Sequence, residues 1–234
     1  MSTQRPQLVN GEIYHIILRA VGDALVFNDE KDYYRGIFSL YEFNNTKLVE
    51  IRKRREERKK EKTSGCPTPA DRELLVEILA FCFMPNHIHL LVRQLKDNGI
   101  SQFMQKVGGG YANYFNKKYG RKGHLFNRFK AVLIKTDEQL QIVFVYIHAN
   151  PISLIEPGWK ENGIKKQDKV INFLEEEYRW SSFFDYLGKK NFSSVTERDF
   201  ILEAMSREQG CREAVENWIK HKKETRDFGD IVLE

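Results

Sequence analysis

The sequence predicts an α+β fold, in which helices pack against an antiparallel-leaning central sheet and a small helical appendage follows at the C-terminus. β-rich and helix-periodic segments follow one another in the order strand, helix, strand, strand, helix, strand, helix. Only Met84, Pro85 and Asn86 separate the two central strands, which is typical of a tight antiparallel turn. After Pro157 and Gly158 the chain becomes more charged and its patterns are helical, so we expect one domain over residues 1–157 and a helical extension over 158–234.

The first strand and helix follow from composition. "IYHIILRAV", residues 13–21, is rich in β-forming residues. In "NDEKDYYRGIFSLYEF", Asn28 or Asp29 can cap a helix whose apolar residues recur at helical spacing. The charged insertion near 50–72 has two interpretations. One is a solvated helical extension and a mobile loop ending near Pro67 and Pro69, and the other is a basic arm that contacts phosphates.

The middle of the chain contains the hairpin and a long helical pattern. "LLVEILAFCF" and "HIHLLVRQ" are the two hairpin strands. "ISQFMQKVGGGYANYFNKKYG" is helical at both ends, with Ser101 as its expected cap. Glycines inside a helix each cost about 1 kcal/mol relative to alanine. Glycines 108–110 therefore predict a kink, a break or two shorter helices, and a phosphate-cradling loop is the alternative.

The remaining elements also have recognisable starts and stops. "GHLFNRFKAVLIKT" predicts a strand. Residues 136–139, Thr-Asp-Glu-Gln, form a capping-box start for a helix that Asn150 and Pro151 should end. "YRWSSFFDYLG", "ERDFILEAMS" and "REAVENWIKHKK" predict the helices of the extension.

Composition places the chain among folded soluble proteins. Its formal net charge is +5 and its pI about 8.9, a basic excess too mild to identify a polyanionic partner by itself. The three cysteines are scattered, which indicates a reducing compartment and predicts a cytoplasmic protein. We expect no membrane association, because there is no signal-peptide core and no bilayer-length apolar run.

Two histidines inside an apolar strand are the first candidate for chemistry. His87 and His89 are two apart, so they point to the same face of a strand, about 7 Å apart along the backbone. Two imidazoles side by side can bind one cation. The alternative is a pair of half-exposed polar residues on a wet sheet face.

A second candidate lies on the helix that follows residue 136. Tyr146 and Asn150 are four apart and therefore share one helix face. An amide oxygen is a hard ligand, so two imidazoles and Asn150 could together hold Mn²⁺ or Mg²⁺. Taken singly, Tyr146 is equally a core-edge tyrosine and Asn150 a helix stop.

Three segments in this order resemble the single-tyrosine HUH transposases of the insertion-sequence-200-like family, most closely the REP-associated branch. They are "FMPNHIHLLV", "YANYFNKKYGRKGHLFNRFKAV" and "YIHANPI", and the resemblance covers roughly residues 11–151, with "YRWSSFFDYLG" extending it. It implies a ferredoxin-like HUH nuclease fold. It also implies that His87 and His89 bind the metal, that Asn150 completes the metal site and that Tyr146 is the catalytic nucleophile. The glycine triplet and the long charged segment depart from the family pattern.

The resemblance implies a metal-dependent single-stranded DNA endonuclease and strand transferase, a transposase. Such an enzyme would form a 5′-phosphotyrosine on hairpin or repeat DNA with Mg²⁺ or Mn²⁺, as a monomer or homodimer. Imidazoles bind metal only when neutral, so activity should fall as the pH drops through about 6.5.

Basic and aromatic residues that alternate after residue 92 are typical of a groove for single-stranded nucleic acid. The expected DNA-binding residues are Arg93, Lys106, Lys117, Lys118, Arg121, Lys122, Arg128 and Lys130. The alternative is that the aromatic residues are core and the cations merely solvated. Tyr111 and Tyr119 are rival nucleophiles that lack a metal-type residue one turn later before a helix stop. His15 and His124 could approach the site but are better explained by structural roles, and His148 should face elsewhere.

Two further functions stay open. One is a domesticated, non-catalytic protein of the same fold that binds DNA or RNA hairpins. The other is a small-molecule phosphoesterase that uses the same histidine pair, which the basic-aromatic segment disfavours. A protein that only binds hairpins has no need of His87, His89 and Tyr146, so their presence favours the nuclease.

Overall fold

The protein is built around one four-stranded antiparallel sheet. The computed structural model describes residues 6–22, 24–64 and 72–221. The strand order is β2-β3-β1-β4, and every neighbouring pair is antiparallel. The strands are β1 (Ile13–Arg19), β2 (Val76–Met84), β3 (His87–Gln94) and β4 (Lys130–Ile134). The predicted α+β class and the hairpin at Pro85 and Asn86 are therefore confirmed.

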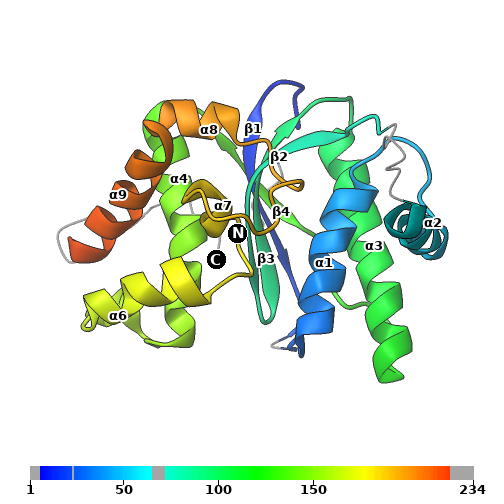
Figure 1. Cartoon of the computed structure of the whole chain (residues 1–234), viewed down its shortest axis with the longest axis horizontal. Coiled ribbons are helices and arrows are strands. Elements are labelled where there is room, and N and C mark those ends of the chain that lie inside the picture. The colour runs from blue at the N-terminus through cyan, green and yellow to red at the C-terminus, as the bar shows by residue number, and fades with distance from the viewer. Residues whose placement is uncertain (1–5, 23, 65–71, 222–234) are drawn as a thin grey trace.

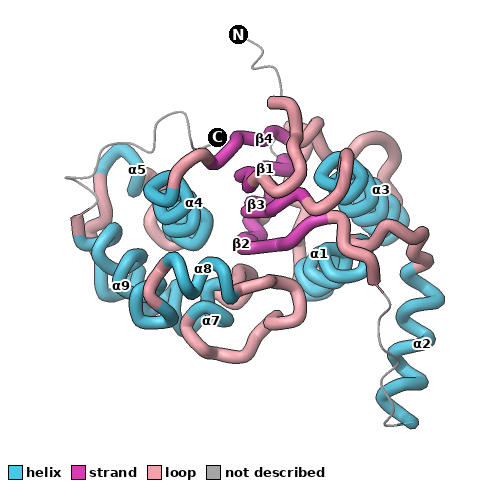
Figure 2. Tube along the Cα trace, turned by 90° about the horizontal axis from the view of Figure 1, so that it is seen from above, coloured by secondary structure: helices cyan, strands magenta, loops and turns pink. Residues whose placement is uncertain are grey.

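Helices cover both faces of the sheet (Figures 1 and 2). On one face lie α1 (Glu30–Phe43) and α3 (Gly99–Tyr119), with α2 (Ile51–Ser64) outside them. On the other face lie α4 (Asp137–Ala149) and the C-terminal helices. No helix in these described stretches is both long and apolar enough to cross a membrane.

Strand alternation divides the interior into two cores. Tyr14, Ile16 and Leu18 of β1 belong to the core under α1 and α3, as do Ile88 and Leu90 of β3. The intervening residues of both strands therefore point to the α4 side. His87 and His89 are among these intervening residues, and this fixes which face of the sheet carries the candidate site.

The C-terminal segment builds the core on the α4 side. Its short elements are η1 (Asn150–Leu154), α5 (Trp159–Asn162), α6 (Gln167–Asn172), η2 (Phe173–Glu177), α7 (Phe183–Tyr186), α8 (Asp199–Ala204) and α9 (Arg207–Lys220). Trp159, Val215 and Ile219 are buried in the same cluster as Phe144 of α4. The described part of the C-terminal segment thus packs directly on α4. The domain boundary expected at residue 157 stays a prediction.

The prediction that glycines 108–110 interrupt the third helix was wrong. α3 runs unbroken over 21 residues, and Asn98 rather than Ser101 is its N-cap. A Cβ atom at Gly110 would lie 2.3 Å from Cε2 of Phe43, whereas one at Gly109 would meet nothing within 4 Å. Gly110 therefore allows α1 and α3 to pack closely. A helical glycine triplet is not a phosphate-cradling loop.

Other boundaries were partly predicted. Asp29 caps α1 and Thr136 caps α4, each by accepting a bond from a backbone amide of the first turn. The expected strand in "GHLFNRFKAVLIKT" is limited to β4, because its first half is a loop. This loop is hydrogen-bonded to the end of β1. The backbone N–H of Asn127 donates to the Arg19 carbonyl at 2.9 Å. α4 ends as predicted before Pro151, although a 3₁₀ turn continues from Asn150.

Two sequence-based predictions concern residues outside the described stretches. The mobile loop expected near Pro67 and Pro69 is one, and the last two residues of "REAVENWIKHKK", Lys222 and Lys223, are the other.

The glycine packing gives a matched pair of tests. Gly109→Ala should stabilise the protein by about 0.5–1 kcal/mol, because a helical Ala loses less backbone entropy and the site is open. Gly110→Ala should destabilise it by about 1–3 kcal/mol, because the new methyl group overlaps Phe43. Urea unfolding of both variants measures the difference, and equal effects would show that the Phe43 contact does not limit helix packing.

Candidate functional site

Three imidazoles form a hydrogen-bonded row on the α4 face of the sheet. Nε2 of His87 lies 3.0 Å from Nε2 of His89, and Nδ1 of His89 lies 3.0 Å from Nε2 of His15. The row ends at Asn86, whose Oδ1 is 2.6 Å from Nδ1 of His87. The register explains His15: Ile17 of β1 pairs with His89, so His15 is two residues along the same face and stacks on His89, with ring centroids 5.3 Å apart.

One neutral tautomer at each ring accounts for the three hydrogen bonds of the row. If Nδ1–H of His87 donates to Asn86, Nε2 of His87 can accept from Nε2–H of His89. Nδ1 of His89 can then accept from Nε2–H of His15. All three imidazoles can therefore be neutral. This is favourable because burying a charged ring would be costly.

Burial keeps these imidazoles neutral. His87 is 8% exposed and His89 1% exposed. Burial lowers the pKa of His87 to about 3, with Arg19 and Lys160 adding repulsion, and burial also places the pKa of His89 well below 6.5. Because burial lowers the pKa of both rings, we expect them to stay neutral below pH 6.5, so that the acidic limit of activity lies at a lower pH than the sequence alone predicts.

The histidine pair has the spacing of two ligands of one metal ion. Two nitrogens that each lie about 2.1 Å from an ion, at a right angle, are about 3.0 Å apart. That is the distance between Nε2 of His87 and Nε2 of His89. Among the described residues, no group of three or more His, Cys, Asp or Glu side chains could hold a metal. The pair fits as part of a metal site whose other ligands would be neutral oxygens or substrate.

α4 brings Tyr146 onto the same histidines. Its ring centroid lies 5.4 Å from that of His89 and 5.8 Å from that of His15, in edge-on contacts. The side chain is 2% exposed, and Nζ of Lys160 lies 5.6 Å from the ring centroid. Burial raises the pKa of Tyr146 to about 12, while a hydrogen bond with Asn150 and the charge of Arg19 act in the opposite direction. The phenol is thus next to the histidines of its own chain, but covered.

Asn150 lies one turn beyond Tyr146, as the spacing of four predicts. Its Nδ2 donates to the Tyr146 carbonyl at 2.9 Å, and the residue is 5% exposed. This bond fixes the Asn150 side chain to the turn of α4 that carries Tyr146. Its amide oxygen is the atom that a metal ion would use.

Sequence reasoning missed two cations at the site, Arg19 and Lys160. Arg19 pairs with His87 in the β1–β3 register, and both cations act electrostatically on His87. The sequence could have placed Arg19 at the site, because it follows His15 by four positions and therefore lies on the same face of the strand. Lys160 could not be placed in this way, because only the packing of α5 brings it to Tyr146. The importance of His15 was likewise underestimated.

The expected DNA-binding residues are divided between the two faces. Lys130 pairs with Ile17 and is exposed on the histidine face, and Arg128 and Lys122 are exposed in the loop before it. Arg93 is paired with Glu77 at 2.6 Å, and Arg121 donates to the His124 carbonyl at 3.0 Å.

The others lie on α3, behind the sheet. Lys106 donates to the Thr46 and Lys47 carbonyls, Lys118 pairs with Asp29 and Asp32, and Lys117 lines a cavity between α2 and α3. A contact with DNA stays a prediction for all eight residues.

The other candidate tyrosines and histidines lie elsewhere. Tyr111 donates to the Val26 carbonyl and Tyr119 to Asp32, both on the α1–α3 side. His148 is buried 2.9 Å from Oγ of Ser182 and faces away from Tyr146, as expected. His124 is exposed.

Part of the chain is similar to a known protein family. The model of the family described as "Transposase IS200 like" matches residues 47–150. No curated protein matches the chain. A REP-associated tyrosine transposase bound to a REP hairpin has a similar structure, with a TM-score of 0.48 and 16% identity, covering 85% of this chain and 93% of that one. A bacterial tRNA(His) guanylyltransferase-like protein in complex with ATP gives a TM-score of 0.37 and 10% identity, covering 74% and 71%.

The family match includes both strands of the hairpin, α3, β4 and α4. The part of this chain that carries His87, His89, Tyr146 and Asn150 is therefore similar to the transposases of the IS200-like family.

Proposed function

We propose that the protein is a metal-dependent single-stranded DNA endonuclease and strand transferase that uses Tyr146 as its nucleophile. The observation that carries the proposal is the contact of the Tyr146 ring with His89, beside a histidine pair whose spacing fits a metal ion. The family match supports a transposase. The motif resemblance suggests hairpin or repeat DNA as the substrate. It also suggests that the protein is similar to the REP-associated branch of the family.

The proposed step exchanges one phosphodiester for another. Oη of Tyr146 bonds to phosphorus, the bond from phosphorus to the 3′ oxygen breaks, and the phenol proton ends on that oxygen. The products are a 5′-phosphotyrosine and a free 3′-hydroxyl. A 3′-hydroxyl can reverse the step on a new strand without ATP. Bound at His87, His89 and Asn150, Mg²⁺ or Mn²⁺ would polarise the phosphate.

The chain's own cations support this step. Arg19 lowers the pKa of the Tyr146 phenol, against the effect of burial. A scissile phosphate beside Arg19 and Lys160 would have its negative charge balanced, and charge that develops during transfer would be stabilised. In this proposal Arg19 and Lys160 hold the phosphate while the histidines hold the metal.

Access to the phenol requires a local movement. Tyr146 is 2% exposed, and the exposed Lys160 side chain lies over its ring. Lys160 belongs to α5, a helix of only four residues. We propose that a bound strand attracts the Lys160 ammonium to its phosphate and thereby uncovers the phenol.

Tyr146 contacts the candidate metal-binding histidines of its own chain. The ring centroids of Tyr146 and His89 are 5.4 Å apart. Cleavage by a single chain therefore needs no exchange of α4 between subunits, and a monomer or a homodimer can work in this way.

The second candidate function is a non-catalytic protein that binds DNA or RNA hairpins. The burial of Tyr146 favours it, because a covered phenol cannot attack. The experiments below distinguish the two functions.

The first test is a covalent adduct at Tyr146. Incubation with labelled single-stranded hairpin oligonucleotides and Mn²⁺ or Mg²⁺ should give a protein–DNA band that survives denaturation. Tyr146→Phe should abolish this band, because the phenol is the attacking group. Tyr119→Phe should retain it, since Tyr119 bonds to Asp32 behind the sheet. Hairpin binding without a band in the wild-type protein would favour the binder.

The second test removes one metal ligand. His87→Ala should reduce cleavage at least 100-fold and weaken Mn²⁺ binding, measured by calorimetry, while DNA affinity changes less than threefold. His124→Ala is the matched control, because that imidazole is exposed and outside the row. Loss of cleavage and DNA binding together in His87→Ala would indicate a structural histidine.

The third test concerns Arg19. Arg19→Gln should lower the rate of adduct formation roughly 100-fold at saturating DNA, because one charge that stabilises the transferring phosphate is lost. Mn²⁺ binding should persist. Lys135→Gln removes an exposed charge beyond the far end of β4 and should leave the rate within about twofold. An unchanged rate in Arg19→Gln would remove Arg19 from the phosphate site.

A further inference from the structure

A cationic cavity lies on the face of the sheet that the histidines do not occupy. Its volume is about 890 Å³, and α1, α2, α3 and residues 190–195 line it. No carboxylate lines it among the described residues. Its six cations are Lys31, Arg35, Arg55, Arg58, Lys118 and Lys190. An adjoining cavity of about 750 Å³ shares Arg35, Arg55, Arg58 and Tyr114 with it.

Arg35 is the unusual group in this cavity. It is 6% exposed, its Nη1 is buried without a hydrogen-bond partner in the described structure, and Nη2 reaches only the Gly110 carbonyl at 3.5 Å. Burial, with the nearby charge of Arg55, lowers the pKa of Arg35 to about 10. A buried guanidinium without a carboxylate is costly to the fold. A bound anion would remove that cost.

The nearby carboxylates are already paired with other cations. Glu42 binds Arg54 and Arg58, at 3.0 and 2.9 Å. Asp29 and Asp32 bind Lys118 at 2.8 and 2.7 Å. An anion that pairs with Arg35 would therefore come from outside the described part of the chain.

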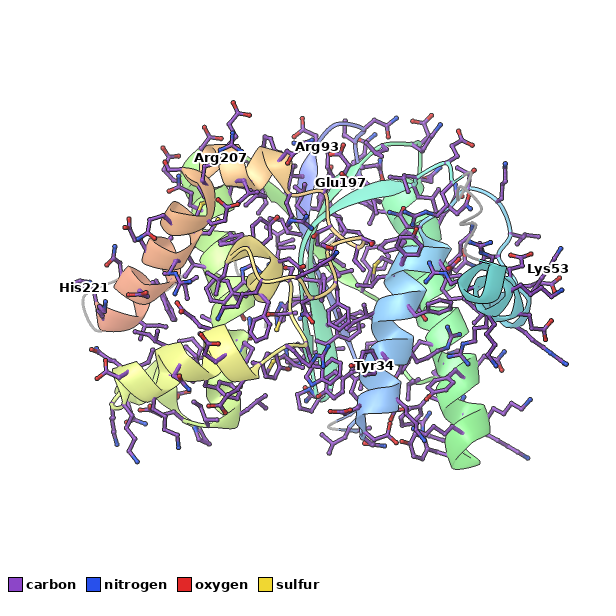
Figure 3. All side chains as sticks on the ribbon, in the orientation of Figure 1. Tyr34, Lys53, Arg93, Glu197, Arg207 and His221 are labelled. Atoms are coloured by element: carbon purple, nitrogen blue, oxygen red, sulfur yellow. The ribbon has the colours of Figure 1, made fainter. Side chains whose placement is uncertain are left out.

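Aromatic rings surround the cations. Those that line the cavity are Tyr34, Phe38, Tyr41, Tyr114 and Phe192. Tyr34 is 41% exposed, and Figure 3 shows it on α1. An exposed ring beside cations suits a ligand that carries a flat base and a phosphate, because bases stack and phosphates pair.

We propose that this cavity binds a nucleotide, free or as one unit of a single strand, with its phosphate on Arg35 and its base against the aromatic wall. A guanidinium matches phosphate by two parallel hydrogen bonds. The cavity lies across the sheet from Tyr146, so the site is separate from the cleavage site and does not depend on cleavage. An acidic peptide would pair with the cations but would not use the exposed ring of Tyr34.

Binding is measured with the full chain in EDTA, by fluorescence anisotropy of a labelled 12-nucleotide oligothymidylate. Arg35→Met should weaken binding at least tenfold and leave the melting temperature equal or higher, because it keeps an apolar stem and removes a buried charge. An Arg35 that served only the fold would instead lower the melting temperature. Arg55→Gln and Lys190→Gln should each weaken binding several-fold. These two variants test the same site if Arg35→Met does not fold.

Lys53→Gln is the matched control, because Lys53 is exposed on α2 and points away from α1 (Figure 3). It should change the affinity less than twofold. Hydrogen exchange with the oligonucleotide bound should slow in α1 and in residues 190–195. Cavity variants that bind like Lys53→Gln, without this slowing, would overturn the proposal.

Competition identifies the source of the ligand. Displacement by thymidine monophosphate at micromolar concentration points to a free nucleotide, and displacement only by unlabelled oligonucleotide points to a strand. Both support the site. Equal displacement by polyglutamate of matched charge would overturn the proposal in favour of an acidic peptide. Because EDTA prevents metal-dependent cleavage, a failure of the Tyr146 reaction does not affect this outcome.

Discussion

The antiparallel pairing of β1 with β3 is the constraint on which the site depends. It places His15, His89 and His87 on one face, because side chains alternate along a strand and the register sets Ile17 opposite His89. A slip of one residue would turn all three imidazoles into the core under α1 and α3. The α1–α3 core opposes that slip, since it already holds the intervening Ile88 and Leu90. Apolar packing on one face thus positions polar chemistry on the other.

A row of buried imidazoles is stabilised by hydrogen bonds between its rings. Asn86, His87, His89 and His15 bond in sequence, and the Tyr146 ring packs edge-on against two of them. The row also explains why burial does not damage a metal site. If His87 and His89 held a metal ion, the His89 proton would move from Nε2 to Nδ1 and be donated to Nε2 of His15, which would hold the ring in place. The structural role and the proposed metal role therefore use the same atoms.

Local patterns in the sequence were sufficient for much of the fold and for the histidine pair. The hairpin at Pro85, the caps of α1 and α4, and the shared face of Tyr146 and Asn150 each depend on residues within a few positions of one another. Continuity of α3 was not predictable in this way, because the reason for Gly110 is the ring of Phe43 on another helix. Lys160 reaches Tyr146 only through tertiary packing. The basic-aromatic segment looked like one groove because neighbours in sequence were taken as neighbours in space. The cations of α3 lie on one side of the sheet, whereas Lys130 of β4 faces the histidine side.

The division of that segment has a physical consequence for how a polyanion can contact the protein. The sheet separates the cations around Arg35 from Arg19 and Lys160, so no straight strand can contact both groups. At one edge of the sheet, residues 180–182 cover β2 through the bond from the Phe83 amide to the Trp180 carbonyl and through the bridge between Cys82 and Ser181. At the other edge is β4, and the loop from α3 to β4 passes from one side to the other with Lys122 and Arg128 exposed. Positive charge thus continues around the β4 edge, and repulsion among these cations falls when a polyanion follows that path. The cations of this segment therefore lie on both sides of the sheet and in the loop that joins α3 to β4, and their contact with DNA stays a prediction.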